Sequence, residues 1–218
     1  VLMPRFSYLF SEDNKNEIKK LSRQFLNVTF LISVPCCCGI ILVADQIVEV
    51  LFGVEFLPAI STIRILSILI VLMPLSGGVF CQLLLTAGKE RSYLACVLIG
   101  TVVNAVLNYL LIPTFTQNGA AIASIIAEFT VSISMIVATR KTIKVSMCCR
   151  DVFSILTSAF FMSLTLVLCH KLFLGQAVWM RLIVEIVIAV LVYFLCVFML
   201  KNSASIKIIR MIKNKTGF

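Results

Sequence analysis

Charged side chains are scarce in this chain. Asp, Glu, Lys and Arg make up 13% of its 218 residues, whereas a soluble domain usually contains about 25%. Apolar residues account for 61% and the mean hydropathy is +1.09, which excludes a soluble domain and predicts a protein whose solvent is lipid. The formal net charge of +9 does not indicate nucleic acid as a partner, because the basic residues lie between hydrophobic runs and form no stripe.

The residue patterns of catalytic and metal sites are also missing. The single histidine, His170, has no neighbouring cluster of ligands, and the nine cysteines show no paired C-x2-C spacing of the kind that binds zinc. No GxxxxGK[ST] phosphate loop occurs, which excludes nucleotide hydrolysis by this chain. We therefore expect no catalytic residues, no metal and no cofactor, and a protein that is not an enzyme.

Long apolar runs take up most of the sequence. They cover roughly residues 25–44, 59–87, 93–113, 119–139, 154–173 and 179–200. Each is long enough for a helix that crosses a hydrocarbon core about 30 Å thick. Membrane β-strands are excluded because they alternate apolar and polar residues, whereas residues 65–72 are continuously apolar. The predicted fold class is all-α, a polytopic bundle of six transmembrane helices in a membrane domain over residues 25–200.

Two more polar segments flank this membrane domain. Residues 1–24 combine the end of an upstream helix with a cytoplasmic amphipathic connector, in which Ser11 is the candidate N-cap. Residues 201–218 are predicted to form a basic cytoplasmic tail. Since the chain opens at Val1, within an apolar run and without a signal peptide, we expect an upstream part of the protein to precede it.

Lysine and arginine are concentrated in alternate connecting segments. These segments contain Arg5, Lys15, Lys19, Lys20, Arg23, Lys89, Arg91, Arg140, Lys141, Lys144, Arg150, Lys201, Lys207, Arg210, Lys213 and Lys215. Because such residues stay on the cytoplasmic side of a membrane, both ends of the chain should be cytoplasmic. The opposite side then includes Asp45, Asn118 and Trp179.

A series of short motifs follows in a fixed order. It begins with VLMPRFS at residues 1–7, LFG at 51–53 and TIRIL at 62–66, and continues with LLTAGKER at 84–91, NAVLNYLLIP at 104–113 and NGAAIASIIAE at 118–128. In this order and spacing, the motifs resemble the carboxy-terminal half of polysaccharide flippases of the Wzx kind. These proteins belong to the multidrug/oligosaccharidyl-lipid/polysaccharide exporter superfamily. The last two apolar runs match the family only in hydrophobicity and in the basic tail that follows.

The resemblance implies a transporter with two pseudo-symmetric lobes around a central cavity. This chain would form the second lobe, and the amino-terminal lobe of the same protein would be its partner. The implied function is the flipping of undecaprenyl-pyrophosphate-linked oligosaccharide across the bacterial inner membrane by alternating access, for O-antigen and lipopolysaccharide synthesis. Membrane lipid and the lipid-linked substrate are the implied partners, and polysaccharide polymerase machinery is a further candidate.

Glu128 lies near the middle of the run 119–139, where an ionised carboxylate is costly and should face protein or water. Ala120, Ser124 and Ser132 share its helical face, because residues four apart lie above one another. Two interpretations stay open for Glu128. It is either a neutral carboxylic acid bonded to a neighbouring helix, or a group that supplies cavity polarity or ion coupling.

Arg64 lies just inside the outer end of the second run. Its guanidinium either reaches back to the lipid headgroups or grips pyrophosphate with its planar fork, and the resemblance favours the second interpretation. Asn104 and Asn108 are four residues apart and offer amide groups to neighbouring helices or to sugar hydroxyls, and Gln82 has the same status. The candidate substrate-binding residues are Arg64, Gln82, Asn104, Asn108 and Glu128.

Three further patterns predict how the helices bend and pack. Pro74, followed by glycines at 77 and 78, should break the second span. Arg181 and Glu185 are four residues apart, which predicts an ion pair along one helix. A ridge that lets two helices approach closely comprises Gly119, Ala123 and Ala127.

Two other classes of function stay open. A drug or cation antiporter of the same superfamily would use similar helices but a more aromatic or acidic cavity. A membrane enzyme, such as a polymerase or ligase acting on the lipid-linked sugar, usually presents a large outer loop with catalytic residues. The outer loops of this chain are short and nearly free of charge, which argues against the enzyme.

Overall fold

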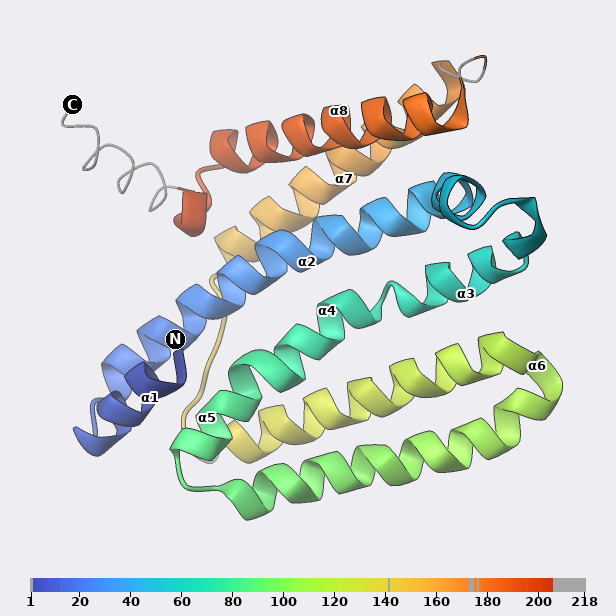
Figure 1. Cartoon of the computed structure of the whole chain (residues 1–218). Coiled ribbons are helices and arrows are strands. Elements are labelled where there is room, and N and C mark those ends of the chain that lie inside the picture. Colours follow the sequence, from blue (N-terminus) through green and yellow to red (C-terminus); the bar gives the residue numbers. More distant parts are fainter. Residues whose placement is uncertain (1, 141, 173–174, 176, 206–218) are drawn as a thin grey trace. The chain divides into compact units, whose positions relative to one another are not determined.

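The computed structural model describes residues 2–140, 142–172, 175 and 177–205, where every regular element is a helix (Figure 1). The elements are α1 (Leu2–Ser11), α2 (Lys15–Leu51), the short η1 (Val54–Phe56), α3 (Ala59–Leu66), α4 (Leu69–Met73), the π-helix η2 (Pro74–Phe80), α5 (Cys81–Thr86), α6 (Glu90–Arg140), α7 (Cys149–Leu172) and α8 (Val178–Met199). The all-α fold class is confirmed. Val1, Lys141 and the expected basic tail beyond residue 205 lie outside the described residues.

The chain divides into two compact units. Unit 1 comprises Val1–Thr29 and Ile65–Ser146, and unit 2 comprises Phe30–Arg64 and Met147–Phe218. Unit 1 therefore contains α1, the first turns of α2, and the helices α4 to α6. Unit 2 contains the rest of α2, most of α3, and the helices α7 and α8.

Five helices of the described chain are long and apolar enough to cross a membrane. The longest, α6, has 51 residues and would measure about 75 Å if it were straight. At Thr116, however, its backbone leaves the helical region with φ 50° and ψ −127°, and the chain doubles back there (Figure 1). The segments 93–113 and 119–139 thus form the two arms of one hairpin, so the six predicted runs occupy five helices.

Small residues let the two arms of α6 lie close together. A Cβ atom added to Gly100 would come 2.1 Å from Cγ2 of Val131, and one added to Gly119 would come 2.4 Å from the carbonyl oxygen of Leu111. Ala123 and Ala127 are buried beside them. The predicted ridge of small residues is confirmed.

The second predicted span is broken at the expected place. α4 ends at Met73, and Pro74 opens the π-helix η2, which continues to Phe80. Proline supplies no N–H group, so the regular ladder of the helix cannot continue through it. The break takes the form of a wider helical turn, which presents Ser76 to the interior of unit 1.

The segment before the first span differs from the prediction. Ser11 is not an N-cap, because it is the last residue of α1 and its hydroxyl donates to the carbonyl oxygen of Tyr8 (2.7 Å). Asn14 supplies the cap instead, and its Oδ1 accepts the backbone N–H of Glu17 (3.2 Å). From there α2 continues without interruption, so the predicted connector forms the first turns of the first membrane helix.

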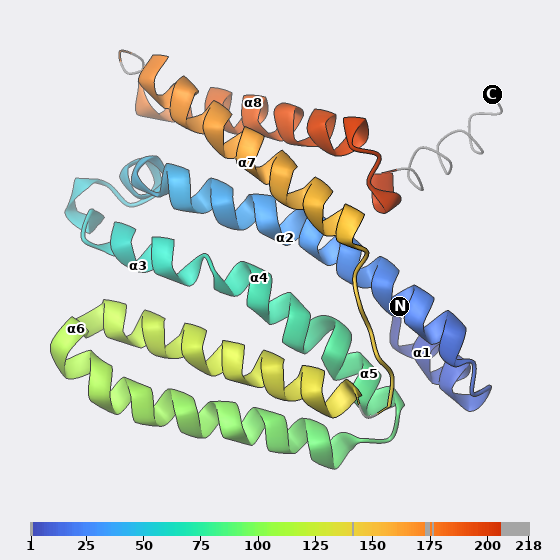
Figure 2. The same ribbon diagram turned by 180° about the vertical axis from the view of Figure 1, so that it is seen from behind.

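In unit 2 the helices α7 and α8 lie side by side (Figure 1, Figure 2). They share an apolar core with α2 that includes Leu31, Met162 and Tyr193. Pro35 of α2 has no N–H group for the carbonyl of Leu31, one turn earlier. The hydroxyl of Tyr193 donates to that carbonyl instead (2.8 Å), so the proline of one helix is compensated by a tyrosine of another.

Candidate functional site

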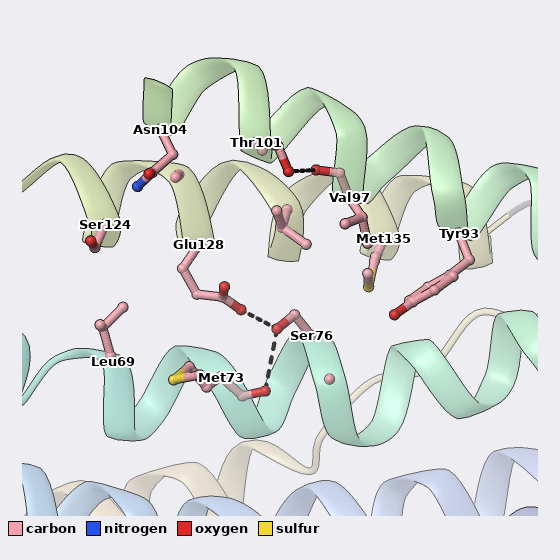
Figure 3. Close-up of a pocket in the computed structure, with 14 residues that line it drawn as sticks. Leu69, Met73, Ser76, Tyr93, Val97, Thr101, Asn104, Ser124, Glu128 and Met135 are labelled. Carbon is pink, nitrogen blue, oxygen red and sulfur yellow. Dashed lines mark hydrogen bonds between the residues drawn. The ribbon is translucent and has the colours of Figure 1, made fainter. Parts of the chain in front are cut away.

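Unit 1 contains a cavity of about 550 Å³ between the broken helix α4–η2 and the two arms of α6 (Figure 3). Leu69, Met73 and Val97 contribute part of its apolar wall. The polar groups come from all three helical segments. They are Ser76, Tyr93, Thr101, Asn104, Ser124 and Glu128.

Glu128 reaches from the second arm of α6 across the cavity to η2 (Figure 3). Its Oε1 accepts a hydrogen bond from the hydroxyl of Ser76. Ser124 lies one turn before Glu128 and lines the same cavity, while its hydroxyl donates to the carbonyl oxygen of Ala120 (2.9 Å). The prediction that Glu128 faces the protein interior on the same side as Ser124 is confirmed.

The two asparagines of the first arm form a pair. The side-chain amide of Asn108 donates to Oδ1 of Asn104 (2.8 Å), and Asn104 lines the cavity. The Oδ1 atom of Asn108 is buried without a hydrogen-bond partner among the described residues. The prediction that the two asparagines share one face of the helix is thus confirmed, and Asn108 bonds to the cavity-lining Asn104 without lining the cavity itself.

Electrostatics limits what this cavity can bind. No lysine, arginine or histidine lines it within the described part of the chain, while Glu128 provides a carboxylate. A carboxylate accepts hydrogen bonds and repels anions. The cavity is therefore suited to a group that donates hydrogen bonds, such as a hydroxyl or an amine, and unsuited to a phosphate.

Two of the five predicted site residues lie elsewhere. Gln82 is on α5 and does not line the cavity. Arg64 belongs to unit 2, where a terminal nitrogen donates to Oδ1 of Asp45 and Nε donates to the carbonyl oxygen of Ile41 (3.2 Å). The structure therefore brings Asn104, Asn108 and Glu128 together and leaves Gln82 and Arg64 outside this cavity.

Sequence reasoning missed a polar cluster in unit 2. Glu185, which is 1% exposed, accepts a hydrogen bond at Oε2 from the amide of Gln46 (2.7 Å). His170 lies 3.7 Å and Arg181 3.8 Å from its Oε1. The predicted pair of Arg181 with Glu185 is confirmed, but the contribution of Gln46 and His170 is new. The sequence carried no signal for it, because the three helices meet only in the folded chain.

The comparisons with known proteins agree with this architecture. Residues 1–199 match the family model described as "Lipid II flippase MurJ". The chain belongs to this family. A solved structure titled "Lipid II flippase MurJ, inward closed conformation" matches with a TM-score of 0.71 and 14% sequence identity, over 90% of this chain and 41% of that one. None of the curated proteins matches.

Membership of the MurJ family tests the predictions of superfamily, of enzyme activity and of a multi-pass membrane protein. The chain is part of the predicted flippase superfamily, in the MurJ family rather than specifically the Wzx kind. Flippases are transporters, so the prediction that the protein is not an enzyme is confirmed. The family and the apolar helices also confirm a multi-pass membrane protein. This chain spans 41% of the MurJ structure that it matches.

Proposed function

We propose that the full-length protein flips an undecaprenyl-pyrophosphate-linked saccharide across the bacterial inner membrane by alternating access. Its family membership supports this function. The observation that carries the proposal is the cavity of about 550 Å³, whose polar groups lie on membrane-spanning helices. A chain that only anchors a protein in lipid has no use for a carboxylate such as Glu128 between its helices, because burial of that group is costly.

For the cargo, we propose first the lipid II that the family's name specifies. The O-antigen repeat unit is the second candidate, because the ordered motifs between residues 1 and 128 resemble the Wzx kind. Both cargos join a long lipid to a hydroxyl-rich head through pyrophosphate. The cavity of unit 1 suits the saccharide of either cargo, since it offers the acceptor groups of Glu128 and Asn104 and no cation within its described lining.

For the pyrophosphate we propose Arg64. Its guanidinium fork matches phosphate oxygens and stays charged in a low dielectric. In this structure Asp45 and the carbonyl of Ile41 engage one edge of the guanidinium, so a phosphate would share Arg64 with Asp45 or displace it. Gln82, which lies on α5 directly after the π-helix η2, and Asn108, which donates to Asn104, complete the proposed substrate-binding set.

The proposed orientation places both ends of the chain in the cytoplasm. Arg91 and Arg140 lie near the two ends of α6, whereas Asn118 lies beside the turn at Thr116. The hairpin therefore separates the two arginines from Asn118. This separation agrees with the concentration of lysine and arginine in alternate connecting segments, which predicts that the arginines and Asn118 lie on opposite sides of the membrane. We further propose that the chain forms the second lobe of a two-lobe transporter, with polysaccharide polymerase machinery as a partner.

Complementation distinguishes the two cargos. The full-length gene would be expressed in cells depleted of their lipid II flippase, and separately in cells that lack their O-antigen flippase. Restored growth in the first strain identifies lipid II as the cargo, and restored surface O-antigen in the second identifies the repeat unit. Failure in both strains, with the protein abundant in the membrane, contradicts the proposed function. Gained drug resistance in the same cells would support an antiporter instead.

A further inference from the structure

The hydroxyl of Ser76 has more acceptors within reach than it can satisfy. It donates to Glu128 across the cavity, and it also lies 3.2 Å from the carbonyl oxygen of Met73 and 3.4 Å from that of Leu72. A serine hydroxyl carries a single proton. It can therefore serve Glu128 or its own helix at one time, but not both.

The π-helix accounts for this position of Ser76. Pro74 opens η2, and the wider turns after it place Ser76 against the second arm of α6, where it is 4% exposed. Single π-helical turns inside α-helices are rare and are found frequently at functional sites. Here the π-helical turn presents the buried hydroxyl of Ser76 to Glu128. Among the described residues, Glu128 is the one carboxylate that lines the cavity.

Glu128 retains capacity for a further donor. An ionised carboxylate can accept about four hydrogen bonds, and among the described residues Ser76 is the one donor that the structure gives it. Two other lining hydroxyls already bond to their own arms of α6. Ser124 donates to Ala120 and Thr101 donates to Val97 (3.0 Å).

We propose that Ser76 is a surrogate donor, which occupies Glu128 while no cargo is bound. A hydroxyl or amine of the transported head group then displaces the hydroxyl of Ser76 from Glu128. When the cargo donates to Glu128, the hydroxyl of Ser76 turns back to the carbonyl of Met73 and keeps a hydrogen bond. Ser76 would thus determine how strongly the cavity selects a head group that donates hydrogen bonds. This inference rests on the proposed function, because it takes the saccharide as the ligand of the cavity.

The proposal predicts an unusual sign for Ser76→Ala. Without the surrogate donor, Glu128 loses its hydrogen bond across the cavity until cargo binds, and a carboxylate between membrane helices is costly unless it has a donor. Binding of saccharide-bearing carrier should then tighten by about three- to tenfold. A serine that only supports the fold would give weaker or unchanged binding when it is removed.

The experiment measures dissociation constants of the full-length protein in lipid nanodiscs. The probes are undecaprenyl pyrophosphate with its saccharide and undecaprenyl pyrophosphate alone. We expect Ser76→Ala to tighten only the saccharide-bearing probe, Ser76→Thr to behave as wild type because it keeps the hydroxyl, and Glu128→Leu to weaken that probe. The matched control is Ser22→Ala, which removes an equally buried hydroxyl that donates to the carbonyl of Ile18 (2.8 Å).

Glu128→Gln distinguishes the two kinds of donor. The amide keeps an acceptor oxygen but loses the charge, so it should reduce binding of a hydroxyl donor slightly and of an amine strongly. Unchanged or weaker binding by a folded Ser76→Ala protein overturns the surrogate-donor proposal while leaving the flippase function standing. If the wild-type protein binds neither probe, the proposed function itself is contradicted.

Discussion

Gly119→Ala tests whether the hairpin of α6 depends on the close approach of its two arms. The new methyl group would lie 2.4 Å from the carbonyl oxygen and 2.6 Å from the carbonyl carbon of Leu111, and 3.0 Å from the backbone nitrogen of Ile112. All three are backbone atoms, so no side-chain rotation can relieve the overlap. The arms must separate or the turn at Thr116 must deform.

Two opposing effects set the magnitude for this variant. Alanine is a better helix former than glycine by up to about 1 kcal/mol, whereas overpacking costs about 1–3 kcal/mol and more where backbone must move. The overlap with backbone should dominate, so we expect a net loss of about 1–2 kcal/mol in the free energy of unfolding. Since Gly119 lies in the same arm as Glu128, the cavity should be distorted as well.

The assay is reversible unfolding of the purified full-length protein in mixed micelles. Gly39→Ala is the matched control, because Gly39 lies inside α2 and a Cβ atom there would meet nothing within 4 Å. The control should be neutral or more stable by about 0.5–1 kcal/mol, from the helix preference alone. If Gly119→Ala is as stable as Gly39→Ala, the arms are not held at the distance described here.

Three further predictions follow from other contacts. Filling the cavity with Gly77→Leu, where a Cβ atom meets nothing within 4 Å, should abolish export while membrane levels stay normal in immunoblots, and normal export would mean that the cavity is not used. Arg64→Ala should impair export of the lipid-linked sugar far more than Arg64→Lys, because a hydrogen bond to a charged group contributes about 1.5–3 kcal/mol and lysine keeps the charge. Near-normal export by both variants at matched abundance would leave Arg64 as a headgroup anchor. Glu185→Leu should destabilise unit 2 by about 3 kcal/mol in thermal unfolding, since it leaves Arg181 and Gln46 without their buried partner, and an unchanged melting temperature would show that the cluster contributes nothing.

Features that depend on one segment of sequence could be predicted. The apolar runs follow from hydrophobicity, the break at Pro74 from the missing N–H group, and the close approach at Gly119 from the absence of a side chain. The pair of Arg181 and Glu185 follows from helical spacing. Each of these consequences arises within a helix or at a single residue, so no knowledge of the tertiary arrangement was needed.

Features that join distant segments could not be predicted. The bond between Ser76 and Glu128 depends on how far the π-helix rotates η2 relative to α6, and sequence spacing does not determine that rotation. The contact of Gln46 with Glu185 similarly requires α2 and α8 to be packed together. At the start of α2, Ser11 was the predicted cap, but the chain turns at Asp13, with φ 48°, and Asn14 caps the helix instead.

The motifs suggested the Wzx kind, whereas the chain belongs to the MurJ family, and this difference also has a physical explanation. The motifs that suggested the Wzx kind include the small residues from Gly119 to Ala127 and the paired Asn104 and Asn108, which form the α6 hairpin and its polar face. Such residues serve the packing of membrane helices, and packing does not by itself specify a cargo. They therefore indicated the fold and the superfamily, while the MurJ family came from the match over residues 1–199.

Flipping of a lipid-linked saccharide by the purified protein tests the central claim most directly. The full-length protein would be reconstituted into liposomes that contain undecaprenyl-pyrophosphate-linked saccharide in both leaflets, and an added glycosidase would measure how much saccharide reaches the outer leaflet. We predict complete digestion with the wild-type protein, and digestion limited to the outer half with Glu128→Leu at equal incorporation. Digestion limited to the outer half with the wild-type protein, or equally complete digestion with both proteins, would contradict the account.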